Sequence, residues 1–273
     1  MRIAVHDLGG DGPALLLAHA TGFHGRVWLP VATRLRPWFH GLAVDERGHG
    51  DSAVPEDASF DWRAMAADLL AVVDDLGLGA TLGAGHSAGA TLLLLAEQAR
   101  PGTFSALWCY EPILPPVDGL APAVDRDRLA AGARKRTDVF ASREAAYQNY
   151  AAKPPFSSLA PDALQAYVDF AFTDLEDGTV RLACRPEHEA RVYENGFSHD
   201  VHHHLDDVGC PVTVACGERT THVDPAAVRA LAARLPRSSV EVVPGLGHFG
   251  PLEDPAAVAD AVRRALGLGE PAR

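Results

Sequence analysis

Short apolar runs alternate with amphipathic segments along most of the chain, and this alternation limits the fold more than any other feature. The runs 14–18 (ALLLA), 104–110 (FSALWCY) and 212–216 (VTVAC) suit buried strands, whereas 62–76 and 88–99 carry apolar residues at helical spacing. Strands that alternate with helices form parallel sheets covered by those helices. The sequence therefore predicts an α/β fold with a mostly parallel central sheet flanked by helices.

The alternation stops between residue 112 and about residue 205. Four patches there have helical spacing, with no convincing pair of strands among them: 126–137, 143–152, 161–172 and 187–195. We expect a helical insertion after the strand that ends near Tyr110. This divides the chain into a core of residues 1–111 and 206–273 and a helical cap, or lid, of residues 112–205.

The charge balance limits the partners. With 36 acidic and 24 basic residues, the formal net charge is −12, whereas nucleic acids and anionic membranes attract basic surfaces. We therefore expect a small-molecule substrate, no nucleic acid and no membrane. The sequence is compatible with a homodimer but does not fix the oligomeric state.

The N-terminus and the cysteines point to a cytoplasmic protein. The first residues, MRIAVHD, lack the apolar core of a signal peptide, and no apolar run reaches the ~20 residues of a membrane span. The four cysteines form no CxxC pair, which favours reduced thiols over disulfides or a metal site. The histidines at 199 and 202–204 are interpreted as a solvated surface cluster. No metal and no cofactor is expected.

Residues 85–89 (GHSAG) fit the pattern G-x-S-x-G, with an apolar strand before them and a helix after. Such a turn exposes the serine hydroxyl at a helix N-terminus, where backbone N–H groups favour a developing negative charge. Bulk two residues to either side would clash with neighbouring backbone. We expect Ser87 to be a nucleophile.

Three further motifs strengthen that expectation. They are 19–23 (HATGF), 45–52 (DERGHGDS) and 247–255 (GHFGPLEDP). With the serine turn, the chain resembles an α/β-hydrolase across nearly its whole length. The first motif is similar to the family's oxyanion loop after the third strand, the second to its D-x-R-G-x-G-x-S turn, and the third to its C-terminal histidine loop. The resemblance implies the α/β-hydrolase fold with a cap.

The resemblance also assigns roles. It makes His248 the general base, whereas His86 and His49 are expected to be structural. It implies that the backbone N–H groups of Ala88 and Thr21 form the oxyanion hole. Ala20 stands where the family usually has glycine, and this leaves the Thr21 N–H in place.

The third member of the expected triad has more than one candidate in the sequence. Most of the family carries an aspartate at the position of Thr220, and a neutral threonine cannot stabilise an imidazolium cation. Glu111, directly after the strand 104–110, is the preferred substitute, and the resemblance extends to relatives that carry their acid at this strand end. Asp224 and Glu218 remain alternatives.

Three functions fit these residues. The first is a serine hydrolase that cleaves a carboxylic ester, lactone or thioester of a small, apolar substrate through an acyl-enzyme on Ser87. The second is a cofactor-free C–C hydrolase, lyase or acyltransferase that uses the same residues. The third is a non-catalytic small-molecule receptor. We prefer the first. The presence of both Ser87 and His248 weighs against the third.

Overall fold

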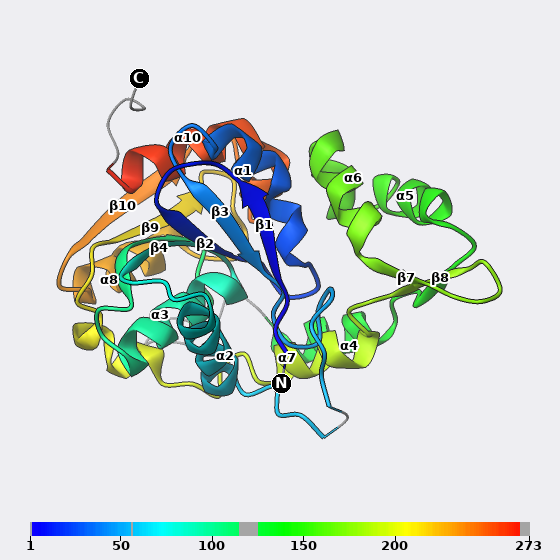
Figure 1. The fold of residues 1–273 in the computed structure, drawn as a ribbon, viewed down its shortest axis with the longest axis horizontal. Helices are drawn as coiled ribbons and strands as arrows, with labels where there is room; N and C mark the ends of the chain where they lie inside the picture. Colours follow the sequence, from blue (N-terminus) through cyan, green and yellow to red (C-terminus); the bar gives the residue numbers. More distant parts are fainter. Residues whose placement is uncertain (1, 56, 115–124, 268–273) are drawn as a thin grey trace.

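The computed structural model describes residues 2–55, 57–114 and 125–267, and its centre is a seven-stranded sheet (Figure 1). The strand order is β1-β3-β2-β4-β5-β9-β10, and all neighbours pair in parallel except β1 with β3. The strands are Val5–Gly9 (β1), Ala14–Ala18 (β2), His40–Val44 (β3), Thr81–His86 (β4), Phe104–Tyr110 (β5), Val212–Gly217 (β9) and Ser238–Val243 (β10).

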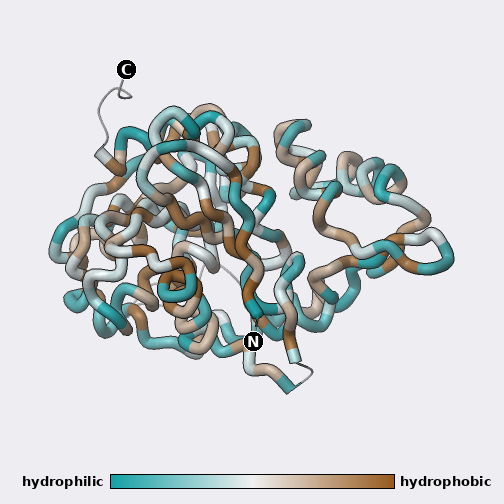
Figure 2. Tube along the Cα trace, viewed as in Figure 1, coloured by the Kyte–Doolittle hydropathy of each residue, from teal (hydrophilic) through white to brown (hydrophobic). Residues whose placement is uncertain are grey.

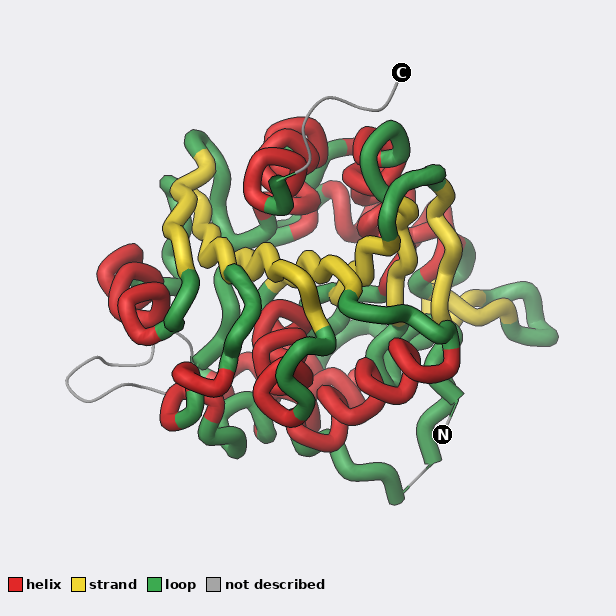
Figure 3. Tube along the Cα trace, turned by 60° about the vertical axis from the view of Figure 1, so that its left-hand side comes forward, coloured by secondary structure: helices red, strands yellow, loops and turns green. Residues whose placement is uncertain are grey.

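Strand β2 shows why the sheet is covered on both faces. Leu15 and Leu17 pack into the apolar cluster on one face, and Leu16 and Ala18 into the cluster on the other. Helices lie above and below the sheet in Figure 3, and the inner strands are the most hydrophobic part of the trace in Figure 2. A strand buried on both sides needs this continuous apolar run.

Two groups of helices supply the covering layers. One face packs against α1 (Leu29–Leu35), α9 (Gly250–Glu253) and α10 (Pro255–Ala265), with the short 3-10 turn η1 (Gly25–Trp28) ahead of α1. The other face packs against α2 (Trp62–Asp75), α3 (Ala88–Ala99) and α8 (Pro225–Arg234). The predicted α/β fold is confirmed.

The segment between β5 and β9 is not purely helical, and that prediction was wrong. Its helices are α4 (Arg126–Arg134), α5 (Arg143–Ala151), α6 (Pro161–Phe170) and α7 (Pro186–Glu194), followed by the 3-10 turns η3 (Val201–His203) and η4 (Leu205–Asp207). It also holds a three-stranded antiparallel sheet of β6 (Val139–Phe140), β8 (Val180–Leu182) and β7 (Phe172–Asp174). Strands of two or three residues are too short to show the alternation that identifies a strand.

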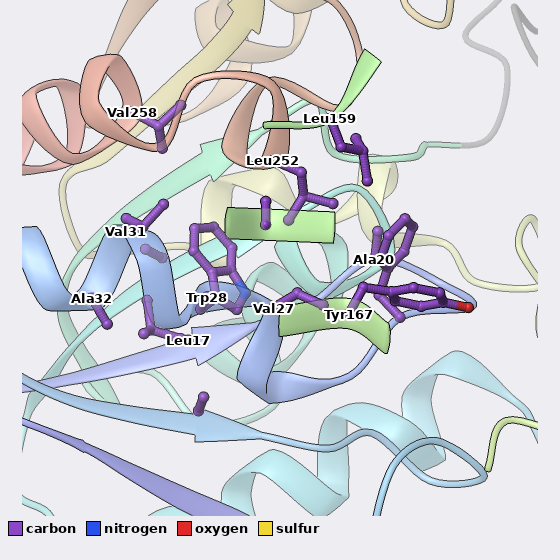
Figure 4. Packing of buried hydrophobic residues seen from close by; sticks show 14 of the residues in the cluster. Leu17, Ala20, Val27, Trp28, Val31, Ala32, Leu159, Tyr167, Leu252 and Val258 are labelled. Atoms are coloured by element: carbon purple, nitrogen blue, oxygen red, sulfur yellow. The ribbon is translucent and has the colours of Figure 1, made fainter. Parts of the chain in front are cut away.

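The insertion packs directly onto the core. Figure 4 shows Tyr167 and Leu159 of the insertion beside Trp28, Val27 and Leu252 of the core. Trp28 is 2% exposed and Tyr167 is 1% exposed, and burying such side chains stabilises the fold by roughly 1.5–3 kcal/mol each. The insertion is therefore fixed against the sheet by a continuous apolar cluster.

The remaining sequence predictions have mixed outcomes. Strand β1 was not predicted, because its sequence VHDLG is half polar. The four cysteines are free and buried, in agreement with reduced thiols. Within the described ranges, no helix combines the length and the apolar character needed to cross a bilayer.

Candidate active site

Ser87 lies in the sharp turn between β4 and α3, with φ 55° and ψ −116°. Its N–H donates to the carbonyl oxygen of Tyr110 at 2.8 Å, which ties the turn to the neighbouring strand. A Cβ on Gly85 would lie 2.6 Å from the backbone of Ala90, and one on Gly89 would lie 2.5 Å from the backbone of Ala18. The predicted clash is confirmed: this turn needs glycine on both sides of the serine.

Replacing Gly89 with alanine is expected to lower the free energy of unfolding by about 1–3 kcal/mol, because the added methyl overlaps the end of β2. Gly132→Ala in α4 is the matched control, since a Cβ there meets no atom within 4 Å. Alanine in that helix should raise the stability by up to about 1 kcal/mol. Urea denaturation of both variants measures the difference. A Gly89→Ala protein as stable as the wild type would contradict the steric argument.

His248 and Glu111 meet beneath the pocket. Nδ1 of His248 lies 2.6 Å from Oε2 of Glu111, and both side chains are buried. The carboxylate also accepts hydrogen bonds from the N–H of Gly217 at 2.9 Å and from Oγ1 of Thr220 at 2.8 Å. Glu111 thus receives three donors. Burial raises its pKa, while the bonds from Gly217 and Thr220 act in the opposite direction.

The backbone at Glu111 is unusual. Among the described residues, only Ser87 and Glu111 combine a side chain with a positive φ, which is 47° for Glu111. Such a conformation costs about 1–3 kcal/mol and persists where the surrounding structure enforces it. Both residues directly follow adjacent parallel strands, β4 and β5. This is the carboxyl edge of the sheet, where ligands bind in open α/β folds.

The alternative acids lie elsewhere. Asp224 caps the N-terminus of α8, where its Oδ1 accepts the N–H of Ala226 at 2.7 Å. Glu218 accepts the N–H of Gly245 at 2.8 Å. Of the three candidate carboxylates, Glu111 is the one hydrogen-bonded to His248.

The loop that carries His248 is held by two side chains from the central strands. His86 donates from Nε2 to the carbonyl oxygen of His248 at 2.8 Å. The hydroxyl of Tyr110 donates to the carbonyl oxygen of Gly247 at 2.6 Å. Burial, followed by the nearby ring of His222, lowers the pKa of His248 to about 3. The imidazole is therefore neutral and able to accept a proton.

His222 was not singled out in the sequence. Its ring stacks on that of His248, with centroids 4.3 Å apart and planes 15° from parallel. It follows Thr220 by two residues and is held there through its N–H, which donates to Oγ1 of Thr220 at 3.2 Å. The position of Thr220 was the signal that pointed to this loop, but the stacking depends on how the loop folds back.

The loop at 19–23 follows β2, which is the second strand of this chain. It brings Thr21 to the same pocket as Ser87. Ala88 is the first residue of α3, and the first N–H groups of a helix have no partner inside it. Neither the Thr21 nor the Ala88 N–H donates a hydrogen bond to the backbone of another described residue. Both amides are available to a ligand.

The turn at 45–52 supports that loop. Nε2 of His49 accepts the N–H of Gly22 at 3.0 Å, and Asp45 accepts the N–H of Gly25 at 2.6 Å. His19, Glu46 and His49 lie close enough to hold a metal ion. However, Nε2 of His19 already accepts a hydrogen bond from the N–H of Glu46. In the same way, Nε2 of His49 accepts one from the N–H of Gly22. The histidine lone pairs that a metal would need are therefore in use, whereas the buried carboxylate oxygens of Glu46 accept no hydrogen bond from the described residues.

The cluster near residue 200 is only partly solvated. His199 is buried and stacks on Trp62, which corrects the expectation of a surface site for this residue. None of the histidines at 199 and 202–204 belongs to the groups of described residues whose potential metal-ligand atoms lie close together.

A pocket with an empty volume of about 630 Å³, including its mouth, opens over Ser87 and His248. The core contributes Ala20, Thr21, Trp62, Ser87, His222, His248 and Phe249, and the insertion contributes Ile113, Arg126, Leu129, Tyr193, Gly196 and Phe197. The site is therefore completed by residues from both parts of the chain.

The chain is similar to known hydrolases. The family model described as "Alpha/beta hydrolase family" matches residues 15–261. The chain is 29% identical over 267 residues to the lipase LipV of Mycobacterium tuberculosis, which covers 96% of this chain and 97% of the lipase. It is 26% identical over 240 residues to the 2-(acetamidomethylene)succinate hydrolase of Mesorhizobium japonicum, covering 88% and 83% of the two chains.

Among solved structures, that of E-2-(acetamidomethylene)succinate hydrolase superposes with a TM-score of 0.84 at 24% identity. The match covers 97% of this chain and 94% of the other. At this identity the likeness shows the shared fold.

Proposed function

The chain belongs to the alpha/beta hydrolase family, and from the geometry of its site we propose that it is a serine hydrolase with Ser87 as nucleophile. It is an enzyme of this family, since its relatives are named as hydrolases, lipases and esterases. The proposed substrate is a small carboxylic ester, lactone or thioester. The proposed triad is Ser87, His248 and Glu111.

The hydrogen bond between Glu111 and Nδ1 of His248 is the observation that carries this proposal. A carboxylate at Nδ1 holds the proton on that nitrogen and leaves Nε2 with the free lone pair that a general base needs. Nε2 then takes the proton of the Ser87 hydroxyl as its oxygen attacks the substrate carbonyl. Glu111 stabilises the imidazolium that forms.

The oxyanion of the tetrahedral intermediate would accept hydrogen bonds from the N–H groups of Thr21 and Ala88. Collapse of the intermediate expels the alcohol or thiol, which receives the proton from His248, and leaves an acyl group on Ser87. Water then attacks the acyl-enzyme by the same route and releases the acid. We also propose that residues 112–205 act as a cap over a core of residues 1–111 and 206–273, because this segment supplies Arg126, Leu129, Tyr193 and Phe197 to the pocket.

A substrate panel tests the proposal. Purified protein is assayed on 4-nitrophenyl butyrate, a small lactone, an acyl thioester and a β-diketone, with product identification by mass spectrometry. Turnover of the first three that depends on Ser87 is the expected result. Cleavage of the β-diketone alone would replace ester hydrolysis with C–C hydrolysis.

A further inference from the structure

The pocket carries one permanent charge. Among the described residues that line it, Arg126 is the only one that is always charged, and no aspartate or glutamate faces it. The other lining side chains include the apolar Trp62, Leu129 and Phe249. A cation in a mostly apolar pocket attracts an anion far more strongly than one in open solvent does.

The guanidinium of Arg126 is held in place without a carboxylate partner. Its Cζ lies 4.8 Å from the ring centroid of Phe197, and its Nη1 donates to the carbonyl oxygen of Glu194 at 3.3 Å. No carboxylate of a described residue lies within 4.0 Å of its nitrogens. The charge of Arg126 is thus oriented but not neutralised within the described part of the chain.

Three other arginines of the insertion are paired with carboxylates. Arg134 is paired with Glu187 and Glu194, Arg136 with Glu189, and Arg143 with Asp174. Asp125, the residue before Arg126, caps α4 instead: its Oδ1 accepts the N–H of Arg128 at 3.0 Å. In a chain with a net charge of −12, Arg126 thus lines the pocket of the proposed nucleophile with no described carboxylate as its partner.

We propose that Arg126 binds a carboxylate of the substrate, so that the enzyme hydrolyses small esters that carry a negative charge. An arginine fork matches a carboxylate with two parallel hydrogen bonds. The apolar lining accommodates the carbon chain between that carboxylate and the scissile bond. The inference rests on the proposed ester hydrolysis and adds a substrate class to it.

Matched pairs of esters test this class. On the acyl side, mono(4-nitrophenyl) glutarate is compared with 4-nitrophenyl pentanoate; on the alcohol side, 4-acetoxybenzoate is compared with its methyl ester. The wild type is expected to have at least a tenfold higher kcat/KM for the anionic member of one pair. Arg126→Gln should lower that value by about 10- to 100-fold, the effect of losing hydrogen bonds to a charged group, and leave the neutral esters within twofold.

Arg128→Gln is the control, because it removes the same charge from an exposed position on the same helix. It should change neither member of a pair. No preference for the anionic ester in the wild type, or an equal loss on both esters in Arg126→Gln, would overturn the inference while leaving ester hydrolysis intact.

A binding measurement tests the carboxylate site at Arg126 even if the proposed ester hydrolysis is wrong. If no ester is turned over, titration of glutarate into the Ser87→Ala protein by calorimetry still tests Arg126. Binding that weakens at least tenfold in the Ser87→Ala/Arg126→Gln protein supports the carboxylate site. Equal binding in both proteins, or none in either, overturns it.

Discussion

Glu111→Gln is expected to lower kcat by about 10⁴-fold, the loss that follows when a triad acid becomes an amide. The amide has one acceptor oxygen where the carboxylate serves three donors: His248, Thr220 and the N–H of Gly217. An amide nitrogen turned toward His248 donates to Nδ1 and moves the imidazole proton to Nε2. The base then lacks the lone pair that takes the serine proton. Steady-state kinetics on a turned-over ester measures the loss.

Two further variants sharpen this result. Asp224→Asn, which keeps a helix-capping side chain, should retain kcat within twofold because Asp224 faces Ala226. Adding Thr220→Asp to Glu111→Gln places a carboxylate at the position that already contacts Oε2 of Glu111. That double variant should regain at least tenfold in kcat. A Glu111→Gln enzyme that keeps more than a tenth of its activity would show that Glu111 is not the acid.

Ser87→Ala is expected to lower kcat by about 10⁶-fold, because without the hydroxyl no acyl-enzyme forms. The fold should persist, since alanine fits the space of the serine and the Ser87 N–H to Tyr110 bond is a backbone bond. Circular dichroism and thermal unfolding check this. Ser105→Ala, an exposed serine on β5, is the control and should keep full activity. Residual hydrolysis above about one per cent in Ser87→Ala would point to another nucleophile.

The sequence predicts most of the core because its signals are local. The run ALLLA at 14–18 indicates a buried strand from its own residues. The glycines at 85 and 89 indicate in the same way that other backbone approaches them closely. Strand β1 and the small sheet of the insertion were missed, since polar or very short strands lack such a signal.

The site residues also divide into those with a local sequence signal and those whose place depends on the folded chain. Ser87 and His248 are indicated by motifs, whereas Glu111 was one of three acids until the course of two loops placed it against His248. Arg126 and His222 gave no signal of their own. Their positions depend on how the insertion and the loop after β9 pack over the carboxyl edge of the sheet.

The most direct test of an activated Ser87 is covalent labelling. The purified protein is treated with a fluorophosphonate probe, and intact mass and peptide mapping are read for the wild type and for Ser87→Ala. We expect one adduct per chain, on Ser87, and none in the variant. An unlabelled wild type, or an adduct that persists in Ser87→Ala, would contradict it.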